Sequence, residues 1–183
     1  MAFKSVLDIL LDNIGTKEAR SGLSKFTPDE TRDSYISHVA DFKKSVKIVT
    51  GEANGKLFDR RDLAQALREG LSSGNGRVFE FVFHKSNDEE TAQAEFQAEN
   101  KELVDLKREF PDRVHIYWSP IRPGQHYAVI DNGKEAILEE PNHIGNKSFW
   151  ATIVFDKNRA RGWAERFDEY IKYCKRLKFA PAS

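Results

Sequence analysis

The chain has 183 residues, of which 39% are hydrophobic and 32% charged, a composition typical of a single soluble globular domain. Lys plus Arg and Asp plus Glu both number 29, so the chain lacks the overall basic surplus that is usual in a dedicated nucleic-acid binder. A single cysteine, Cys174, excludes an internal disulfide and a cysteine-based zinc site, and no apolar run approaches the roughly 20 residues of a membrane span, so we expect a cytoplasmic protein without a membrane segment.

The first predicted element is an amphipathic helix over residues 3–14, where apolar side chains recur at spacings of three and four. Aspartates interrupt this apolar segment and no small-residue cleavage site follows it, so the pattern does not predict a signal peptide. The apolar stripe either packs on its own domain or pairs two subunits. A polar connector over residues 15–25 follows, and we divide the chain into an N-terminal helix and connector (1–26) and one α/β domain (27–183).

Strands and helices then alternate along the chain. Thr27 is the predicted N-cap of a helix that runs to about Lys44, since proline and glutamate occupy the positions that favour a helix start. A later helix is predicted to begin with Asp59 as its N-cap, and a long one to run from the capping box at Ser86 to just before Pro111. These helices separate three β-prone strands, which right-handed crossovers should make parallel, over residues 46–50, 77–84 and 113–118.

In the last third of the domain, the sequence predicts a β-hairpin. Residues 125–131 and 134–139 flank Asn132-Gly133, the strongest short hairpin signal in a sequence. A strand over 148–155 then leads into a final helix with Trp163 and Phe167 on its apolar stripe. We therefore predict an α/β fold, with a mixed, mostly parallel sheet and helices on both faces.

One segment resembles the signature stretch of the phospholipase D-like superfamily. It reads Gln-His-Tyr-Ala-Val-Ile-Asp-Asn-Gly-Lys over residues 125–134, followed by Glu-Glu-Pro-Asn over 139–142. In that family a His-x-Lys strand runs into an Asp-Gly hairpin, and a Gly-Ser-x-Asn segment, another strand and a terminal helix follow. In element order the resemblance covers roughly residues 45–177, and it implies the fold of one phospholipase D-like half.

The hairpin departs from the family motif in either possible alignment. If His126 is the family's histidine, Ala128 stands where the lysine belongs and Asp131 comes two residues early. If Asp131 is the family's aspartate, His126 stands at the lysine position and Gly124 replaces the histidine. Neither alignment restores the full motif.

The segment after the hairpin departs as well. Glu139 and Glu140 stand where the family has glycine and serine, and only Asn142 matches. The resemblance implies that a histidine attacks phosphorus, a second histidine from a repeat or a dimer partner protonates the leaving group, and lysine and asparagine hold the phosphate oxygens. A desolvated carboxylate here would repel that phosphate unless a lysine elsewhere, such as Lys85 or Lys147, compensates.

These positions define the predicted site. His126 begins a strand at the sheet edge, where ligand pockets of α/β folds tend to lie; its alternative role is that of a strand histidine hydrogen-bonded to backbone. No tight metal-ligand spacing and no nucleotide-binding loop is present, so we predict neither metal nor cofactor. The catalytic candidates, if the protein is active, are His126 and Asn142, and the phosphate-binding candidates are Lys85, Arg122, Lys147 and His143.

Three functions remain open from the sequence. The broken motif and the zero net charge favour a catalytically degenerate module that binds a phosphate-bearing ligand or nucleic acid, or a partner protein, or its own copy. The alternative is a divergent, metal-independent phosphodiesterase or nuclease, which would work as a homodimer because each chain carries one motif. In the third, the resemblance is accidental and a Rossmann-like domain binds a small ligand.

Overall fold

The computed structural model describes residues 23–26, 36–51, 53, 58–86, 88–139, 149–154 and 157–180. The predicted helix over residues 3–14 and the predicted helix start at Thr27 lie outside the described residues. Residues 36–40, within the helix predicted from Thr27, are helical. No helix among the described residues combines the length and the apolar character needed to cross a membrane.

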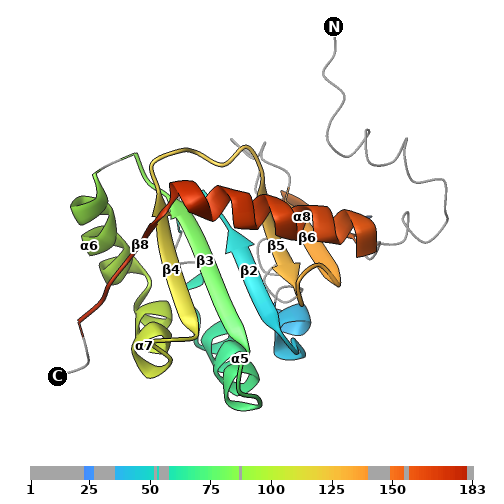
Figure 1. The fold of residues 1–183 in the computed structure, drawn as a ribbon, viewed down its shortest axis with the longest axis horizontal. Helices are drawn as coiled ribbons and strands as arrows, with labels where there is room; N and C mark the ends of the chain where they lie inside the picture. The colour runs from blue at the N-terminus through green and yellow to red at the C-terminus, as the bar shows by residue number, and fades with distance from the viewer. Residues whose placement is uncertain are drawn as a thin grey trace, which may run out of the picture.

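The described strands form one eight-stranded mixed sheet in the order β1-β7-β6-β5-β2-β3-β4-β8 (Figure 1). The three central strands β2, β3 and β4 are parallel, and the strands on either side of them pair antiparallel. The predicted α/β fold is thus confirmed, with its parallel strands at the centre. The strands are β1 (Leu23–Phe26), β2 (Ser45–Val49), β3 (Val78–His84), β4 (Val114–Ser119), β5 (His126–Ile130), β6 (Glu135–Glu139), β7 (Phe149–Val154) and β8 (Lys175–Arg176).

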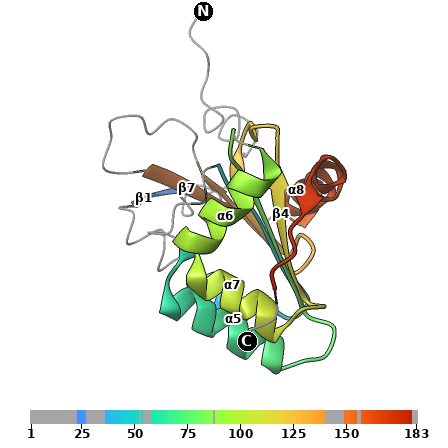
Figure 2. The ribbon, with the colours of Figure 1, turned by 90° about the vertical axis from the view of Figure 1, so that its left-hand side faces the viewer.

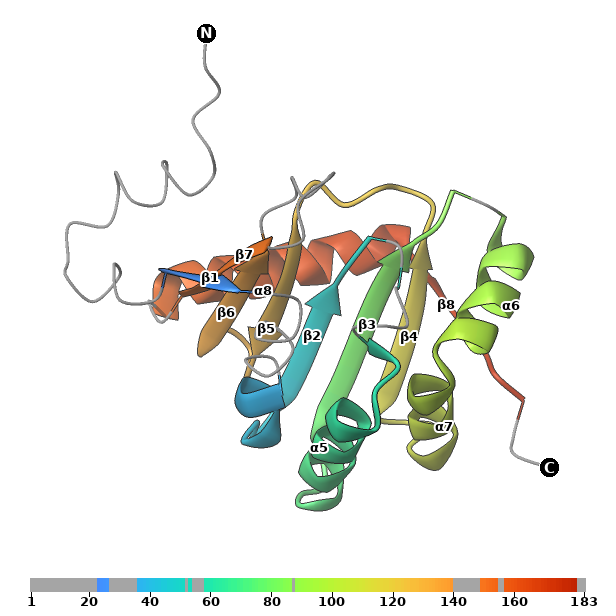
Figure 3. The same cartoon turned by 180° about the vertical axis from the view of Figure 1, so that it is seen from behind.

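Helices cover both faces of the sheet, as Figure 2 shows from its side. Three helices, α5 (Arg61–Ser72), α6 (Glu89–Glu99) and α7 (Lys101–Glu109), lie on one face, which Figure 3 brings to the front. The opposite face carries α8 (Lys157–Tyr170), which crosses the strands and continues into a single 3-10 turn, Ile171–Tyr173.

Alternating side chains of each strand supply two hydrophobic cores. In β2, Val46 and Ile48 point into the core under α5, α6 and α7, whereas Val49 points into the core under α8. Every residue of β2 is buried, because this strand lies in the middle of the sheet with helices on both sides. The continuous β-prone runs of the sequence reflect this double burial.

The prediction that Asp59 caps the helix after β2 is wrong. The N-cap of α5 is Arg60, which makes no side-chain capping bond. Asp59 instead accepts a hydrogen bond at Oδ1 from the backbone N–H of Glu102, 2.7 Å away in the first turn of α7. The carboxylate thus satisfies an open N–H group of a different helix, through a contact between residues distant in sequence.

The prediction of one long helix ending before Pro111 is also wrong, because Asn100 divides it into α6 and α7. Asn100 is fully buried, and its Nδ2 donates to the carbonyl oxygens of Ala53 and Phe96 at 3.3 and 3.4 Å. An asparagine side chain that bonds backbone groups competes with the helix, and here it ties the break to the segment after β2.

The predicted hairpin is confirmed as β5 and β6, with a turn over residues 131–134. Asp131, Asn132 and Gly133 all have positive φ, at 52°, 57° and 92°. A Cβ on Gly133 would lie only 2.6 Å from the Cα of Arg161 in α8. The turn therefore requires glycine both for its backbone conformation and for its close approach to the helix.

Two edge strands were not predicted. Leu23–Phe26, part of which falls in the predicted connector, forms β1 and pairs with β7. Lys175–Arg176 forms β8 and pairs with the middle of β4. Both are short edge strands, so their pairing is determined by the neighbouring strand rather than by a pattern of their own.

Candidate functional site

Four residues meet where the central strands end. β5 is antiparallel to β2, so its first residue, His126, lies beside the carboxyl ends of the parallel strands. The backbone N–H of His84, at the end of β3, donates to the carbonyl of Gly51 at 3.0 Å. The Nδ1 atom of His84 lies 3.0 Å from the carbonyl oxygen of Ser119 at the end of β4. We call Gly51, His84, Ser119 and His126 the carboxyl edge.

The imidazole of His126 lies directly against Gly51. A Cβ built on Gly51 would be 2.9 Å from Nε2 of His126 and 3.1 Å from its Cε1. Any side chain at residue 51 would therefore displace the ring. His126 is partly exposed at this end of the strand. The structure thus places His126 at the sheet edge, as the sequence suggested.

Ala128 is fully buried in the core under α5, α6 and α7. It pairs with Ile48 of β2 on one side and with Ile137 of β6 on the other. A lysine at this position would have to bury its ammonium group among aliphatic side chains, at a high cost in solvation energy. If His126 corresponds to the family's histidine, the place of the family's lysine is filled by core packing.

Lys85 follows His84 but is paired with α6. Its Nζ lies 2.8 Å from Oε2 of Glu95 and 3.1 Å from Oε2 of Glu99, and its side chain is only 12% exposed. Burial alone would lower the pKa of Lys85, but its hydrogen bonds to the two glutamates and their charges outweigh burial and raise it. A phosphate that binds Lys85 would have to displace both carboxylates.

The other predicted phosphate ligands have different positions. Arg122 is exposed in the loop between β4 and β5, and this loop joins Ser119 to His126 at the carboxyl edge. The other three predicted site residues lie outside the described residues: Asn142, His143 and Lys147.

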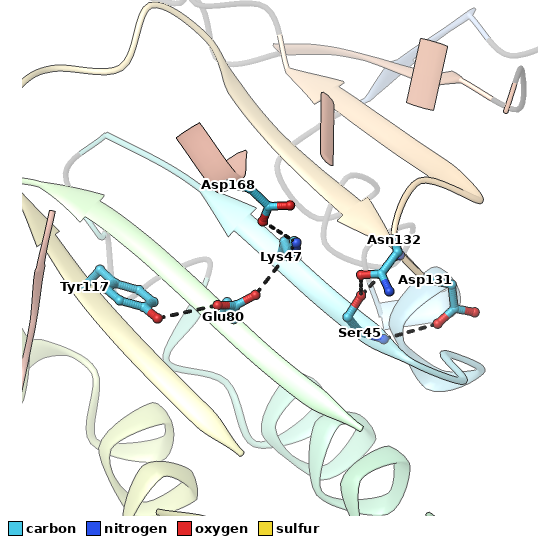
Figure 4. Close-up of polar contacts among 7 residues, drawn as sticks. All are labelled: Ser45, Lys47, Glu80, Tyr117, Asp131, Asn132 and Asp168. Atoms are coloured by element: carbon cyan, nitrogen blue, oxygen red, sulfur yellow. Dashed lines mark hydrogen bonds and ion pairs between the residues drawn. The ribbon is translucent and has the colours of Figure 1, made fainter. Parts of the chain in front are cut away.

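Asp131 lies at the other end of β5 from His126, roughly 16 Å away at the usual rise of a strand. Its Oδ1 accepts hydrogen bonds from the backbone N–H groups of Lys43 and Lys44, at 2.7 Å each. The neighbouring Asn132 exchanges hydrogen bonds with the hydroxyl of Ser45, at 2.8 and 3.1 Å (Figure 4). Asp131 and Asn132 thus attach the hairpin turn to the start of β2.

A buried polar cluster under α8 was not found by sequence reasoning. Lys47 is 7% exposed, and its Nζ lies 2.5 Å from Oδ1 of Asp168 in α8 and 3.9 Å from Oε2 of Glu80 in β3 (Figure 4). Burial raises the pKa of Glu80, although the charge of Lys47 opposes this shift. Charged residues within two β-prone runs were the only signal, and pairing them required the register of β2 against β3.

Metal and thiol chemistry receive no support from the described residues. No group of three His, Cys, Asp or Glu side chains in this part of the chain is placed to hold a metal ion. The thiol of Cys174 donates to the carbonyl of Tyr170 at 3.3 Å, and burial raises its pKa. A raised pKa disfavours the thiolate that nucleophilic chemistry requires.

No family model matches the chain, and no curated protein matches its sequence. Among solved structures, the chain is similar to TrmBL2, an archaeal chromatin protein whose structure shows a mode of DNA binding (TM-score 0.62, 10% identity, 94% of this chain and 60% of that one). It is also similar to the phospholipase D family member Nuc from Salmonella typhimurium, with a TM-score of 0.62 and 12% identity over 86% of this chain and 97% of that one. The similarity to NucT from Helicobacter pylori has a TM-score of 0.54 and 15% identity over 85% of this chain and 98% of that one. These likenesses show that the chain has a phospholipase D-like fold.

Proposed function

We propose that this protein is a catalytically degenerate phospholipase D-like module that binds a phosphate-bearing ligand, such as nucleic acid, at its carboxyl edge. The observation that carries the proposal is the position of His126, which is partly exposed at that edge and lies against Gly51. A ring N–H donates to a phosphate oxygen, and the exposed guanidinium of Arg122 supplies positive charge from the adjoining loop. His143 and Lys147 are proposed as further ligands from the segment after the hairpin.

Binding without cleavage is favoured by the surroundings of His126. Phosphoryl transfer to a histidine requires cations that hold the phosphate oxygens as charge develops. Ala128 has no charge to supply, its place in the core leaves no room for a buried cation, and Lys85 is held between two glutamates. These two features weaken the stabilisation of a transition state more than the binding of a ground state.

Nucleic acid is the ligand class that the similar structures support. TrmBL2 is described as an archaeal chromatin protein that shows a novel mode of DNA binding, and this chain covers 97% of the phospholipase D family member Nuc. By analogy with single-motif members of the superfamily, we propose a cytoplasmic homodimer.

The alternative is a divergent, metal-independent phosphodiesterase that works as a homodimer. His126 would be its nucleophile and Asn142 would hold the phosphate. One observation favours it: the structure keeps an imidazole, that of His126, at the carboxyl edge, and imidazole is the group that acts as nucleophile in such chemistry. The acid would then come from the second subunit of the dimer.

One experiment separates the two functions. Wild type, His126→Ala and the control His115→Gln are incubated with chelator and with labelled single- and double-stranded DNA or a chromogenic phosphodiester. Binding and cleavage are measured, and light scattering gives the molecular mass. We expect binding without cleavage, and about fivefold weaker binding in His126→Ala alone, from the loss of one hydrogen bond worth ~1 kcal/mol. Chelator-resistant cleavage that disappears in His126→Ala would establish the phosphodiesterase instead, and unchanged binding by that variant would refute a role for the edge.

A further inference from the structure

One flank of α8 adjoins the carboxyl edge. The hydroxyl of Tyr170, the last residue of α8, lies 2.8 Å from Oγ of Ser119 and 2.5 Å from the carbonyl oxygen of Ile121. Nearer the start of the helix, the ring of Trp163 packs on Tyr127, the neighbour of His126, with ring centroids 4.8 Å apart. This flank therefore continues the surface formed by the loop between β4 and β5.

The same flank carries an open cleft of about 560 Å³. Nothing lies within 4 Å of the position that a Cβ of Gly162 would take, so the cleft is open at that residue. The two large hydrophobic side chains most exposed among the described residues stand at this corner: Ile121 is 54% and Tyr173 66% exposed. The cleft is lined by Gly162, Glu165, Arg166, Glu169, Tyr170 and Tyr173.

Positive charge is concentrated on this part of the chain. From the start of α8 to Lys178 there are eight Lys and Arg but only three Asp and Glu, a surplus of five positive charges. The remainder of the chain holds 21 Lys and Arg and 26 Asp and Glu. One of the three acids, Asp168, is paired with Lys47 of the sheet. The zero net charge of the whole chain thus conceals a basic segment, in which Lys172 is paired with Glu169 and Lys175 with Glu89. The exposed cations on it are Lys157, Arg161, Arg166, Lys172, Lys175, Arg176 and Lys178.

Flat aromatic and cationic groups are available for stacking in and beside the cleft. The guanidinium of Arg166 lies 4.5 Å from the ring centroid of Trp163, which holds its plane in place. Tyr173 presents its ring to solvent, and the carboxylate of Glu169 in the cleft is paired with Lys172 at 2.6 Å. Exposed rings beside cations form the kind of surface on which unpaired bases stack, whereas a duplex keeps its base faces covered.

We infer that the α8 cleft binds the bases of a single-stranded nucleic acid. Bases stack on Tyr173 and Arg166, while the backbone phosphates contact the surrounding lysines and arginines and extend toward Arg122 at the carboxyl edge. This inference rests on the proposed function, for which it specifies an unpaired, base-bearing strand as the ligand. The carboxyl edge binds phosphate, and the α8 cleft recognises bases.

The test compares ligands with and without bases. Fluorescence anisotropy is measured with a labelled oligothymidylate, with an abasic oligomer of the same length and charge, and with a duplex. We expect wild type to prefer the oligothymidylate over both other ligands. Tyr173→Ala should reduce the affinity for it at least ~fivefold, the effect of losing one stacked base, and should reduce the affinity for the abasic oligomer little. Arg166→Gln should act in the same direction.

Two variants are controls. Tyr173→Phe keeps the ring and should bind like wild type, and Lys134→Ala removes an exposed charge from the hairpin turn, at the other end of β5. Equal affinity for the oligothymidylate and the abasic oligomer, or an unchanged Tyr173→Ala, would overturn the inference. If His126→Ala still weakens both oligomers in that case, the proposed function survives without it. If wild type binds none of the ligands, both fail.

Discussion

At the scale of single residues, the position of the His126 ring depends on the absence of a side chain at Gly51. Gly51 does not have a positive φ, so its backbone conformation is open to other residues; what it provides is the space for an imidazole ring. The sequence predicted His126 at an edge, because it follows a Pro-Gly bend and starts a strand. The role of Gly51 was not predictable, since it depends on the pairing of β5 with β2.

Gly51→Ala should therefore weaken ligand binding as much as a substitution of His126 does. The added methyl group displaces the ring, so we expect about fivefold weaker ligand binding, the equivalent of one hydrogen bond of ~1 kcal/mol. Gly124→Ala, where a Cβ meets nothing within 4 Å, is the matched control and should bind normally. Titration calorimetry with an oligonucleotide measures both variants, and equal affinities would show that the imidazole position does not matter for binding.

His115 controls part of the response of stability to acid. Burial, with the charges of Arg176 and Lys107, lowers its pKa from 6.5 to about 4. Between these values the unfolded chain binds a proton that the folded protein does not, so the free energy of unfolding falls as pH falls. The raised pKa of Glu80 acts in the opposite sense. We expect His115→Gln to flatten the fall between pH 6.5 and 4 in urea denaturation, and an unchanged slope would contradict this assignment.

At the scale of elements, prediction succeeded where each segment carries its own pattern. The central strands have long β-prone runs because they are buried on both faces, and Asn132-Gly133 marks the hairpin by local backbone preference. Prediction failed where a contact between residues distant in sequence determines the local structure or the availability of a side chain. Asn100 breaks a helix through its bond to Ala53, and Lys85 is unavailable because α6 packs beside β3. The position of His126 at the start of β5 was thus predictable, whereas the pairing of Lys85 with two glutamates was not.

The hairpin turn and α8 are joined at Gly133. A Cβ there meets the backbone of α8 and the residue has a positive φ, so Gly133→Ala should destabilise the protein by about 1–3 kcal/mol. Gly162→Ala makes the same substitution inside α8, where the Cβ meets nothing, and should stabilise by up to ~1 kcal/mol through helix propensity. Chemical denaturation gives both values, and destabilisation of similar size in the two variants would contradict the packing described.

At the scale of the whole molecule, the positive and negative charges of a chain with zero net charge are unevenly distributed. The helices α5, α6 and α7 cover one face of the sheet, and the basic segment from α8 to Lys178 lies on the other face and one edge (Figure 1). Composition alone argued against nucleic acid, because it averages over the entire chain. The fold instead places Arg122 and the end of α8 beside the edge that carries His126, and we propose an uncleaved nucleic-acid strand as the ligand.

The most direct test observes the histidines themselves. In protein labelled with ¹⁵N at its histidines, an oligothymidylate is titrated while the imidazole resonances are recorded, and the ligand is then recovered and sized. We expect the resonances of His126 to shift with saturation, those of His38 and His115 to stay in place, and the ligand to be recovered intact. Resonances of His126 that do not move while the ligand binds, or a ligand recovered as fragments, would contradict it.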